Sequence, residues 1–526
     1  MGGIIKKYTI RISNSSVFVK QYLKSDCAYS AGVGTALHEI LRCVQDDTGA
    51  RQLTTCAIND MAAVAMAGIA FQHNRLVGTL EQRLITWDTA SVNTDGDIYQ
   101  NMNNVNRALS ISGIYQYLWR SFTVSTGLDN RMQYGPVYQE LDAYYSASPK
   151  QNHADNDMTG VFAGKNALFI MLESIDTWML TPEYMPNLYG VQQDSIQFVN
   201  HYSPMFISAG TFNTEFTANT GLIPPTNGIN TRVYVENDFP TSLANLFTAA
   251  GYQANSFHSA NPGIYNRGNI HHNLGYDAYH CWTDMGMENY MLDSQLIEGY
   301  DLMTAGDPFF SFIITFSGHG PYTDHMRDIS DAHLEQARAA VDPSAVPATG
   351  SDLEEYIHAI AHAMETDAFV GELMDRLEQD GHLEDTVLIF FTDHYGKYMT
   401  NTQLLMDLKD VDNTDLLCNT PFFIYSADTE HRTVTKFTST MDIAPTVANL
   451  FDLDVNYAYY IGDDIFGDGG GYVIFKGNNW YDGEIYYTPN YTGELTEEIQ
   501  ARNAEISRRV NAAWDTLRSN YFAHPE

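Results

Sequence analysis

Basic residues are scarce in this sequence. Its 526 residues include 28 lysines and arginines against 65 aspartates and glutamates, so the formal net charge at pH 7 is −37. Proteins bind nucleic acid and anionic lipid largely through clustered cations. We therefore expect no nucleic-acid partner and no membrane docking through a basic patch. An acidic surface fits exposure to divalent cations, although acidity alone identifies no function.

Cysteine and long apolar runs are also lacking. The five cysteines form no CxxC pair, which argues against a disulfide framework or a structural zinc cluster. The most apolar run, MAAVAMAGIAF at 61–71, is too short to span a bilayer. The first residues lack the apolar core and cleavage site of a signal peptide. We thus expect neither a signal peptide nor a transmembrane helix in this chain.

The apolar content is sufficient for a large folded core. Apolar residues make up 44% and aromatic residues 13% of the chain. The length suggests one large catalytic domain with appendages. We predict an unassigned segment at 1–90, a helical lead-in and linker at 91–160, a catalytic domain at 161–455, and a small sheet with a terminal helix at 456–526.

Buried strands alternate with helices from residue 161 onward. Apolar runs that end in polar residues lie at 166–174 and 308–320, further strands at 386–391 and 421–426, a helix followed by a strand at 241–258, and helices at 351–380 and 441–451. This alternation predicts an α/β fold, in which helices sandwich a mainly parallel central sheet. Ser351 and Glu354 have the spacing of a capping box. Residues 472–488 indicate a small antiparallel sheet and 495–522 a long helix.

Polar residues follow several of these strands. Ligands of parallel α/β sheets bind outside the carboxyl ends of the strands. We therefore expect these residues to gather along one edge of the sheet: Glu173, His258, His319, Asp393 and His394.

The pair Asp393-His394, in FFTDHYGKY, and Glu173, in FIMLES, could form a metal site. Two carboxylates and an imidazole suit Mn²⁺, Zn²⁺ or Mg²⁺. Taken singly, each has a simpler interpretation. A DH pair at a strand end is commonly a salt bridge or a cap, and a carboxylate after an apolar run is often a solvated turn residue.

Thr211, in AGTFNTEF, is a candidate nucleophile. A threonine at a junction between loop and helix is usually an N-cap. Its hydroxyl becomes nucleophilic only when a base or a metal lowers its pKa. A metal held by Glu173, Asp393 and His394 would do so.

Three further residues could contact substrate. His319, in TFSGHGPY, follows a buried strand, although a lone histidine is more often structural. Arg267, in GIYNRGN, is a rare cation that suits a phosphate clamp but could be a surface charge. His258 follows a strand end and is a weaker candidate.

The motifs, taken in order, resemble those of the lipoteichoic acid synthases and related phosphoglycerol transferases, which belong to the sulfatase-like branch of the alkaline phosphatase superfamily. The similarity runs from about 161 to 522 and includes ITFSGHGPY (314–322), FFTDHYG (390–396) and DIAPTVANLF (442–451). No CxPxR segment is present, which disfavours a sulfatase proper.

The resemblance implies roles for seven residues. Glu173, Thr211, Asp393 and His394 match the ligands of one divalent ion, Mn²⁺ foremost, with Zn²⁺ or Mg²⁺ as alternatives. Thr211 matches the nucleophile as well. Residues that contact phosphate or substrate are matched by Arg267, His319 and, less securely, His258.

The implied activity is a transfer of glycerol phosphate from phosphatidylglycerol to a glycerol-phosphate polymer or a glycan. It would take place at a membrane surface, on the extracellular face of a bacterial cell or after secretion. Members of this family usually carry membrane-spanning helices before the catalytic domain, and none is seen here. Two alternatives stay open: another phosphotransferase, phosphodiesterase or sulfatase-like hydrolase of the superfamily, and a non-catalytic receptor for glycerol phosphate.

Overall fold

The computed structural model describes residues 105–125, 134–207, 209–224, 237–322 and 326–523. All of them belong to one compact unit, Asn74–Glu526. The predicted segment 1–90 lies outside the described residues, and the four-part division of the chain stays a prediction.

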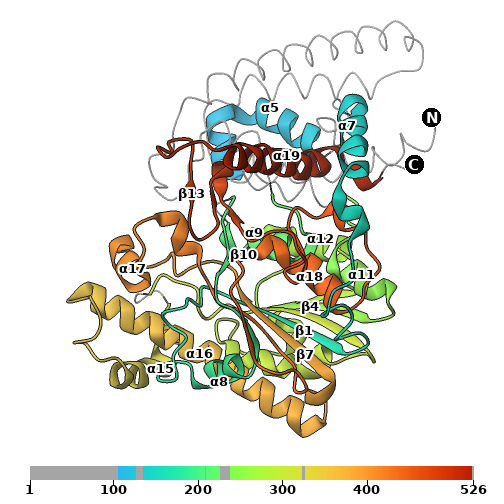
Figure 1. Ribbon diagram of the computed structural model, residues 1–526. Coiled ribbons are helices and arrows are strands. Elements are labelled where there is room, and N and C mark those ends of the chain that lie inside the picture. Colours follow the sequence, from blue (N-terminus) through green and yellow to red (C-terminus); the bar gives the residue numbers. More distant parts are fainter. Residues whose placement is uncertain (1–104, 126–133, 208, 225–236, 323–325, 524–526) are drawn as a thin grey trace, which may run out of the picture. The chain divides into compact units, whose positions relative to one another are not determined.

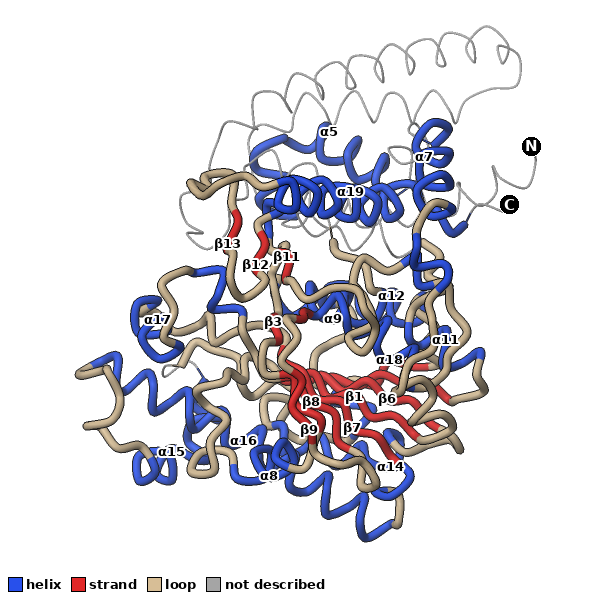
Figure 2. The backbone as a smooth tube through the Cα atoms, viewed as in Figure 1, coloured by secondary structure: helices blue, strands red, loops and turns tan. Residues whose placement is uncertain are grey.

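An eight-stranded sheet forms the centre of this unit (Figures 1 and 2). Its order is β5 (Ala278–His280), β4 (Gln253–His258), β6 (Phe309–Ile314), β1 (Asn166–Leu172), β7 (Thr386–Thr392), β8 (Phe422–Tyr425), β2 (Ile196–Phe198) and β9 (Arg432–Val434). The five strands from β5 to β7 are parallel. β8 runs antiparallel to both β7 and β2, and β2 is parallel to β9. The prediction of a mainly parallel sheet is confirmed.

The central strands are buried on both faces, which explains their continuous apolar sequences. Phe169 of β1 faces the core that includes α9 (Gly210–Thr220), α11 (Leu243–Ala249) and α18 (Ile443–Leu450). The neighbouring Ile170 faces the core that includes α8 (Pro186–Gln193) and α16 (Ser351–Asp380). Helices therefore cover both faces of the sheet, as Figure 1 shows.

The start of α16 differs from the prediction. Gly350, with a φ of 60°, is the N-cap, and no side chain caps the helix. Ser351 is the first residue inside the helix, so the predicted capping box is wrong. Glu354 instead accepts a hydrogen bond from Arg338 of α15 (Arg327–Ala340) over 3.0 Å.

The C-terminal part contains a three-stranded antiparallel sheet and a long helix, as predicted. The strands are β11 (Val473–Ile474), β12 (Trp480–Tyr481) and β13 (Tyr486–Tyr487). The helix is α19 (Glu497–Ser519), capped by Thr496. It packs against α7 (Tyr134–Ser146), where the hydroxyls of Tyr145 and Thr516 lie 2.5 Å apart.

The remaining α-helices and strands of the described residues are α5 (Val105–Ser125), α12 (Arg267–Asn273), α13 (Trp282–Met285), α14 (Tyr300–Met303), α17 (Thr402–Lys409), and the paired short strands β3 (His201–Tyr202) and β10 (Thr438–Ser439). No helix in the described part of the chain has the length and apolar character needed to cross a membrane.

Candidate active site

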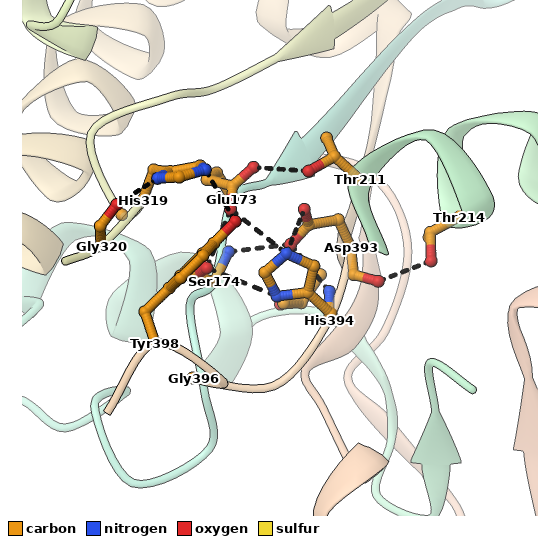
Figure 3. A network of polar contacts seen from close by, with 12 residues as sticks. Glu173, Ser174, Thr211, Thr214, His319, Gly320, Asp393, His394, Gly396 and Tyr398 are labelled. Atoms are coloured by element: carbon orange, nitrogen blue, oxygen red, sulfur yellow. Dashed lines mark hydrogen bonds and ion pairs between the residues drawn. The ribbon is translucent and has the colours of Figure 1, made fainter. Parts of the chain in front are cut away.

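Three of the predicted ligands meet where β1 and β7 end. Leu172 and Thr392 are register partners in these adjacent parallel strands. Glu173 therefore emerges beside Asp393 and His394 (Figure 3). One ligand atom from each of the three lies within 4.8 Å of the others, and all three residues are buried.

Backbone hydrogen bonds fix the orientation of the Asp393 carboxylate. Its Oδ1 accepts the amides of Ser174, over 2.8 Å, and of His394, over 2.7 Å. Ser174 takes a left-handed conformation with a φ of 57°, which turns the chain directly after Glu173. Asp393 Oδ2 is buried without a hydrogen-bond partner and lies 3.3 Å from His394 Nε2.

The hydrogen bonds of His394 determine which ring nitrogen can bind a cation. Nδ1 donates to the Tyr395 carbonyl over 2.9 Å, which leaves Nε2 as the unprotonated nitrogen. Nε2 is buried without a hydrogen-bond partner. It lies 3.4 Å from Glu173 Oε1, so its lone pair faces two carboxylates. That arrangement repels unless a proton or a metal ion lies between these atoms.

The pKa shifts agree with this geometry. Burial, followed by the positive charge of Lys397, lowers the pKa of His394 to about 3, so the imidazole is neutral. Burial, followed by the adjacent Glu173, raises the pKa of Asp393 well above its ordinary value. Two carboxylates this close cannot both ionise without a compensating cation. The donor set therefore fits a divalent ion with mixed oxygen and nitrogen ligands.

Thr211 lies against this cluster. It is the second residue of α9, after the N-cap Ala209, so it is not the N-cap of this helix. Its hydroxyl donates to Glu173 Oε2 over 3.0 Å. Gly210 permits this close approach, since a Cβ there would lie 2.3 Å from His394 Cδ2. One turn later, the Thr214 hydroxyl bonds the Asp393 carbonyl and ties α9 to the end of β7.

His319 lies beside the cluster, on the loop that follows β6. A Cβ at the neighbouring Gly318 would lie 1.8 Å from the Glu173 carbonyl oxygen, so only glycine fits there. His319 Nδ1 contacts the Gly320 carbonyl, and Nε2 lies 2.7 Å from the Tyr398 hydroxyl. Asp293 accepts the amides of Phe316, over 2.7 Å, and Ser317, over 3.0 Å, and so supports this loop.

His258 and Arg267 lie at the same edge of the sheet but have protein partners. His258 ends β4, and its Nδ1 donates to the Ile314 carbonyl over 2.9 Å. Burial lowers its pKa to about 3. Arg267 is buried, and its Nε and Nη2 each donate to Glu215 Oε2 over 2.9 Å. Glu215 Oε1 also accepts a bond of 2.6 Å from His271.

Sequence reasoning missed several residues around the site. Tyr398 contacts His319, and Lys397 lies next to Gly210. Both lie in FFTDHYGKY. A lysine next to predicted metal ligands in so acidic a chain could have indicated a site residue. Asp176 accepts the Gly396 amide over 2.9 Å and pairs with Lys409, so this buried pair holds the loop that follows His394. No pattern in the sequence pointed to it.

A mainly parallel sheet with its polar cluster at the carboxyl ends of β1 and β7 defines an alkaline phosphatase-like fold. Two solved structures share this fold. The lipoteichoic acid synthase LtaP from Listeria monocytogenes matches with a TM-score of 0.59 and 21% identity, over 71% of this chain and 97% of that one. A protein in the alkaline phosphatase superfamily from Vibrio parahaemolyticus matches with a TM-score of 0.52 and 16% identity, over 73% and 97%.

The family model described as Sulfatase matches residues 165–453, more than half of the chain. The chain belongs to the sulfatase family. Curated relatives include lipoteichoic acid synthase 2 of Bacillus subtilis, 24% identical over 62% of this chain and 50% of that protein. Lipoteichoic acid synthase of Staphylococcus aureus is 24% identical over 71% of this chain and 60% of that protein.

The chain thus spans about half to three fifths of the length of these curated relatives. The relationship to lipoteichoic acid synthases that the motifs implied is confirmed, and so is the expectation of a sulfatase-like enzyme. The transferred group, its donor and its acceptor belong to the proposal that follows.

Proposed function

We propose that this protein is a metal-dependent phosphoglycerol transferase with Thr211 as its nucleophile. The donor is phosphatidylglycerol and the acceptor a glycerol-phosphate polymer or a glycan, at the extracellular face of a bacterial membrane. One observation carries the proposal: the Thr211 hydroxyl donates to Glu173 within a buried cluster whose unpartnered atoms face one another. The relatives named as lipoteichoic acid synthases support this reaction class.

Glu173, Asp393 and His394 would hold the divalent ion, with Mn²⁺ the one implied by the motifs and Zn²⁺ or Mg²⁺ the alternatives. When bound, such an ion makes a nearby hydroxyl more acidic and stabilises negative charge on phosphoryl oxygens. Nδ1 of His394 donates to the Tyr395 carbonyl, so Nε2 is the nitrogen that would bind the ion. Thr211 would be the fourth protein ligand.

The chain's own residues then carry the transfer. Thr211 Oγ attacks phosphorus in line, and its proton leaves along the hydrogen bond to Glu173. The bond between phosphorus and the diacylglycerol oxygen breaks, and His319 supplies the proton to that oxygen. The acceptor hydroxyl next attacks the phosphoglyceryl-threonine and gives its proton to His319, and the proton on Glu173 returns to Thr211 Oγ as the bond between that oxygen and phosphorus breaks. The N-terminus of α9, where Thr211 lies, favours the negative charge of the phosphoryl group.

The test is a Thr211→Ala variant assayed on a fluorescent phosphatidylglycerol analogue with Mn²⁺. We expect turnover to fall at least roughly 1,000-fold with Mn²⁺ binding retained, since a covalent nucleophile is lost. Thr217→Ala is the matched control, because that hydroxyl is buried in the same helix but bonds the Asn213 carbonyl. Undiminished turnover in Thr211→Ala would exclude the proposed nucleophile.

A donor screen tests the substrate. Mass spectrometry of wild-type protein quenched during turnover should find glycerol phosphate on the peptide that contains Thr211. Faster turnover of a phosphoethanolamine donor or of a sulfate ester would reassign the reaction within the superfamily. Binding of glycerol phosphate without turnover in excess Mn²⁺ would show a receptor instead.

A further inference from the structure

Lys397 brings a positive charge to the edge of the ligand cluster. Its ammonium lies beside Gly210, the residue before Thr211: a Cβ built on Gly210 would be 2.7 Å from Lys397 Nζ. The same ammonium lies 5.2 Å from the centre of the Tyr398 ring. Lys397 thus lies beside the first turn of α9, which carries Thr211.

The turn that contains Lys397 is fixed by hydrogen bonds of its backbone. The Gly396 amide donates to the buried Asp176, and the Met399 amide donates to the Gly396 carbonyl over 3.1 Å. Asp176 is itself paired with Lys409. The backbone of this turn is therefore fixed, while the half-buried Lys397 side chain extends toward the cluster.

The charges of the site call for one more cation. Glu173 and Asp393 would together balance the charge of a divalent ion, and His394 would add no charge when it binds through Nε2, so the loaded cluster would have no net charge. A phosphodiester brings one negative charge of its own. The predicted clamp, Arg267, already forms a bidentate pair with the buried Glu215. The charge of Arg267 is thus largely neutralised by Glu215, and Lys397 is the cation beside Gly210, the residue before Thr211.

We propose that Lys397 binds a non-bridging oxygen of the phosphodiester that Thr211 attacks, in the role that the sequence assigned to Arg267. This inference deepens the proposed function and rests on it for the identity of the substrate. An ammonium there would balance the substrate charge in the ground state and the additional charge of the transition state.

The experiment measures two affinities of the Lys397→Met variant, which keeps the apolar stem and loses the charge. Inorganic phosphate is titrated into Mn²⁺-loaded protein, and Mn²⁺ into metal-free protein, both by calorimetry. We expect phosphate to bind at least tenfold more weakly. Mn²⁺ should bind equally well or a few-fold more tightly, because a neighbouring like charge has been removed. Lys397→Arg should bind phosphate within threefold of the wild type.

Weaker phosphate binding combined with unchanged or tighter Mn²⁺ binding distinguishes a phosphate-binding role of Lys397 from a structural role. If Lys397 only braced the cluster, Lys397→Met would weaken Mn²⁺ as well as phosphate, and that result would overturn the inference. Phosphate affinity within twofold of the wild type would also overturn it. Neither measurement needs turnover, so a wild-type protein that fails to use phosphatidylglycerol would refute the proposed function and leave this inference standing.

Discussion

Two buried polar clusters lie one helical turn apart along α9. The ligand cluster, Glu173, Asp393 and His394, contacts Thr211. The Glu215 cluster, Glu215, Arg267 and His271, includes the residue four positions later. All six side chains are almost completely excluded from solvent. In the Glu215 cluster, donors from Arg267 and His271 meet both carboxylate oxygens. In the ligand cluster, Asp393 Oδ2 and His394 Nε2 face each other without a hydrogen-bond partner.

The difference separates a structural cluster from a binding site. Buried polar atoms in native proteins are almost always hydrogen-bonded, because desolvation without a partner is costly. In the Glu215 cluster His271 Nδ1 is also buried without a partner, but the carboxylate has a donor on each oxygen and a guanidinium counter-charge, so its charge is compensated without a ligand. A cluster that aims two carboxylates at an imidazole lone pair has to bind a proton or a metal ion to relieve the repulsion. Burial alone therefore does not identify a binding site. Buried carboxylate and imidazole atoms that face one another without a compensating charge do.

The largest expected effect on stability comes from replacing one carboxylate by its amide in each cluster. Glu215→Gln should lower the free energy of unfolding by about 3–5 kcal/mol, because it leaves the buried Arg267 without a counter-charge. Asp393→Asn, in chelator, should change it by less than about 1 kcal/mol or raise it. The new amide keeps the Oδ1 contacts, relieves the repulsion from Glu173 and can donate to His394 Nε2.

Urea denaturation of the metal-free proteins, followed by circular dichroism, measures both changes. If Glu215→Gln does not fold, Arg267→Met offers a second measurement, since it removes the other half of the pair. A large loss in metal-free Asp393→Asn would mean that the ligand cluster is as self-sufficient as the Glu215 cluster, and the comparison would fail.

The next effect is stabilisation by the ion. Mn²⁺ at one hundred times its dissociation constant should stabilise the wild type by about 2.7 kcal/mol, because it binds only the folded state. Asp393→Asn should lose nearly all of this gain, since an amide is a poor ligand for the ion. Denaturation with and without EDTA provides the measurement. Equal stabilisation of wild type and Asp393→Asn would place the ion elsewhere.

Acid should reveal a smaller contribution from the Glu215 cluster. Burial alone would raise the pKa of Glu215, but the charge of Arg267 and the hydrogen bond from His271 dominate and lower it to about 2. Its stabilisation is therefore complete above the unfolded value of 4.5 and is lost as the pH falls toward 2. Between pH 4.5 and 3.5 the wild type should lose about 1 kcal/mol more than Glu215→Gln.

This difference is obtained from urea denaturation of the two metal-free proteins at both pH values. Titratable groups remote from Glu215 contribute equally to wild type and variant, so their effect cancels; the difference therefore reports Glu215 together with its neighbours His258 and His271. Parallel pH dependences would show that Glu215 does not ionise against Arg267 as the structure has it.

The fold was predictable because each strand is marked by a short continuous run of apolar residues. The apolar runs that became β1, β6 and β7 are buried on both faces, and few other structures suit such runs. The start of α16 was wrong for an equally local reason: Ser351 and Glu354 match a capping spacing, but a positive φ at Gly350 starts the helix one residue earlier. Spacing alone does not show which residue has left the helical conformation.

The part of the site that lies at strand ends was predictable, because the strand order of the sheet determines which residues meet there. Glu173 and Asp393-His394 follow neighbouring parallel strands, so the sheet brings them together. The partner of Arg267 was not predictable, because Glu215 lies on a helix and no strand register connects the two. The same reasoning overlooked Lys397, whose closeness to Thr211 depends on the absence of a side chain at Gly210. Positions set by packing between a loop and a helix leave no periodic pattern in the sequence.

The smallest expected effect on stability comes from Thr211, which lies in the same helix, α9, as Glu215. Thr211→Val keeps the shape of the side chain and removes one hydrogen bond to Glu173, which should cost about 0.5 kcal/mol in metal-free protein. Four residues along the helix, Glu215→Gln should lower the free energy of unfolding several times more, because Glu215 is the counter-charge of the buried Arg267. Turnover should show the reverse order, with Thr211→Val inactive. A Thr211→Val protein destabilised as much as Glu215→Gln would mean that the hydroxyl is part of the scaffold, because a nucleophile contributes little to folding and much to the reaction.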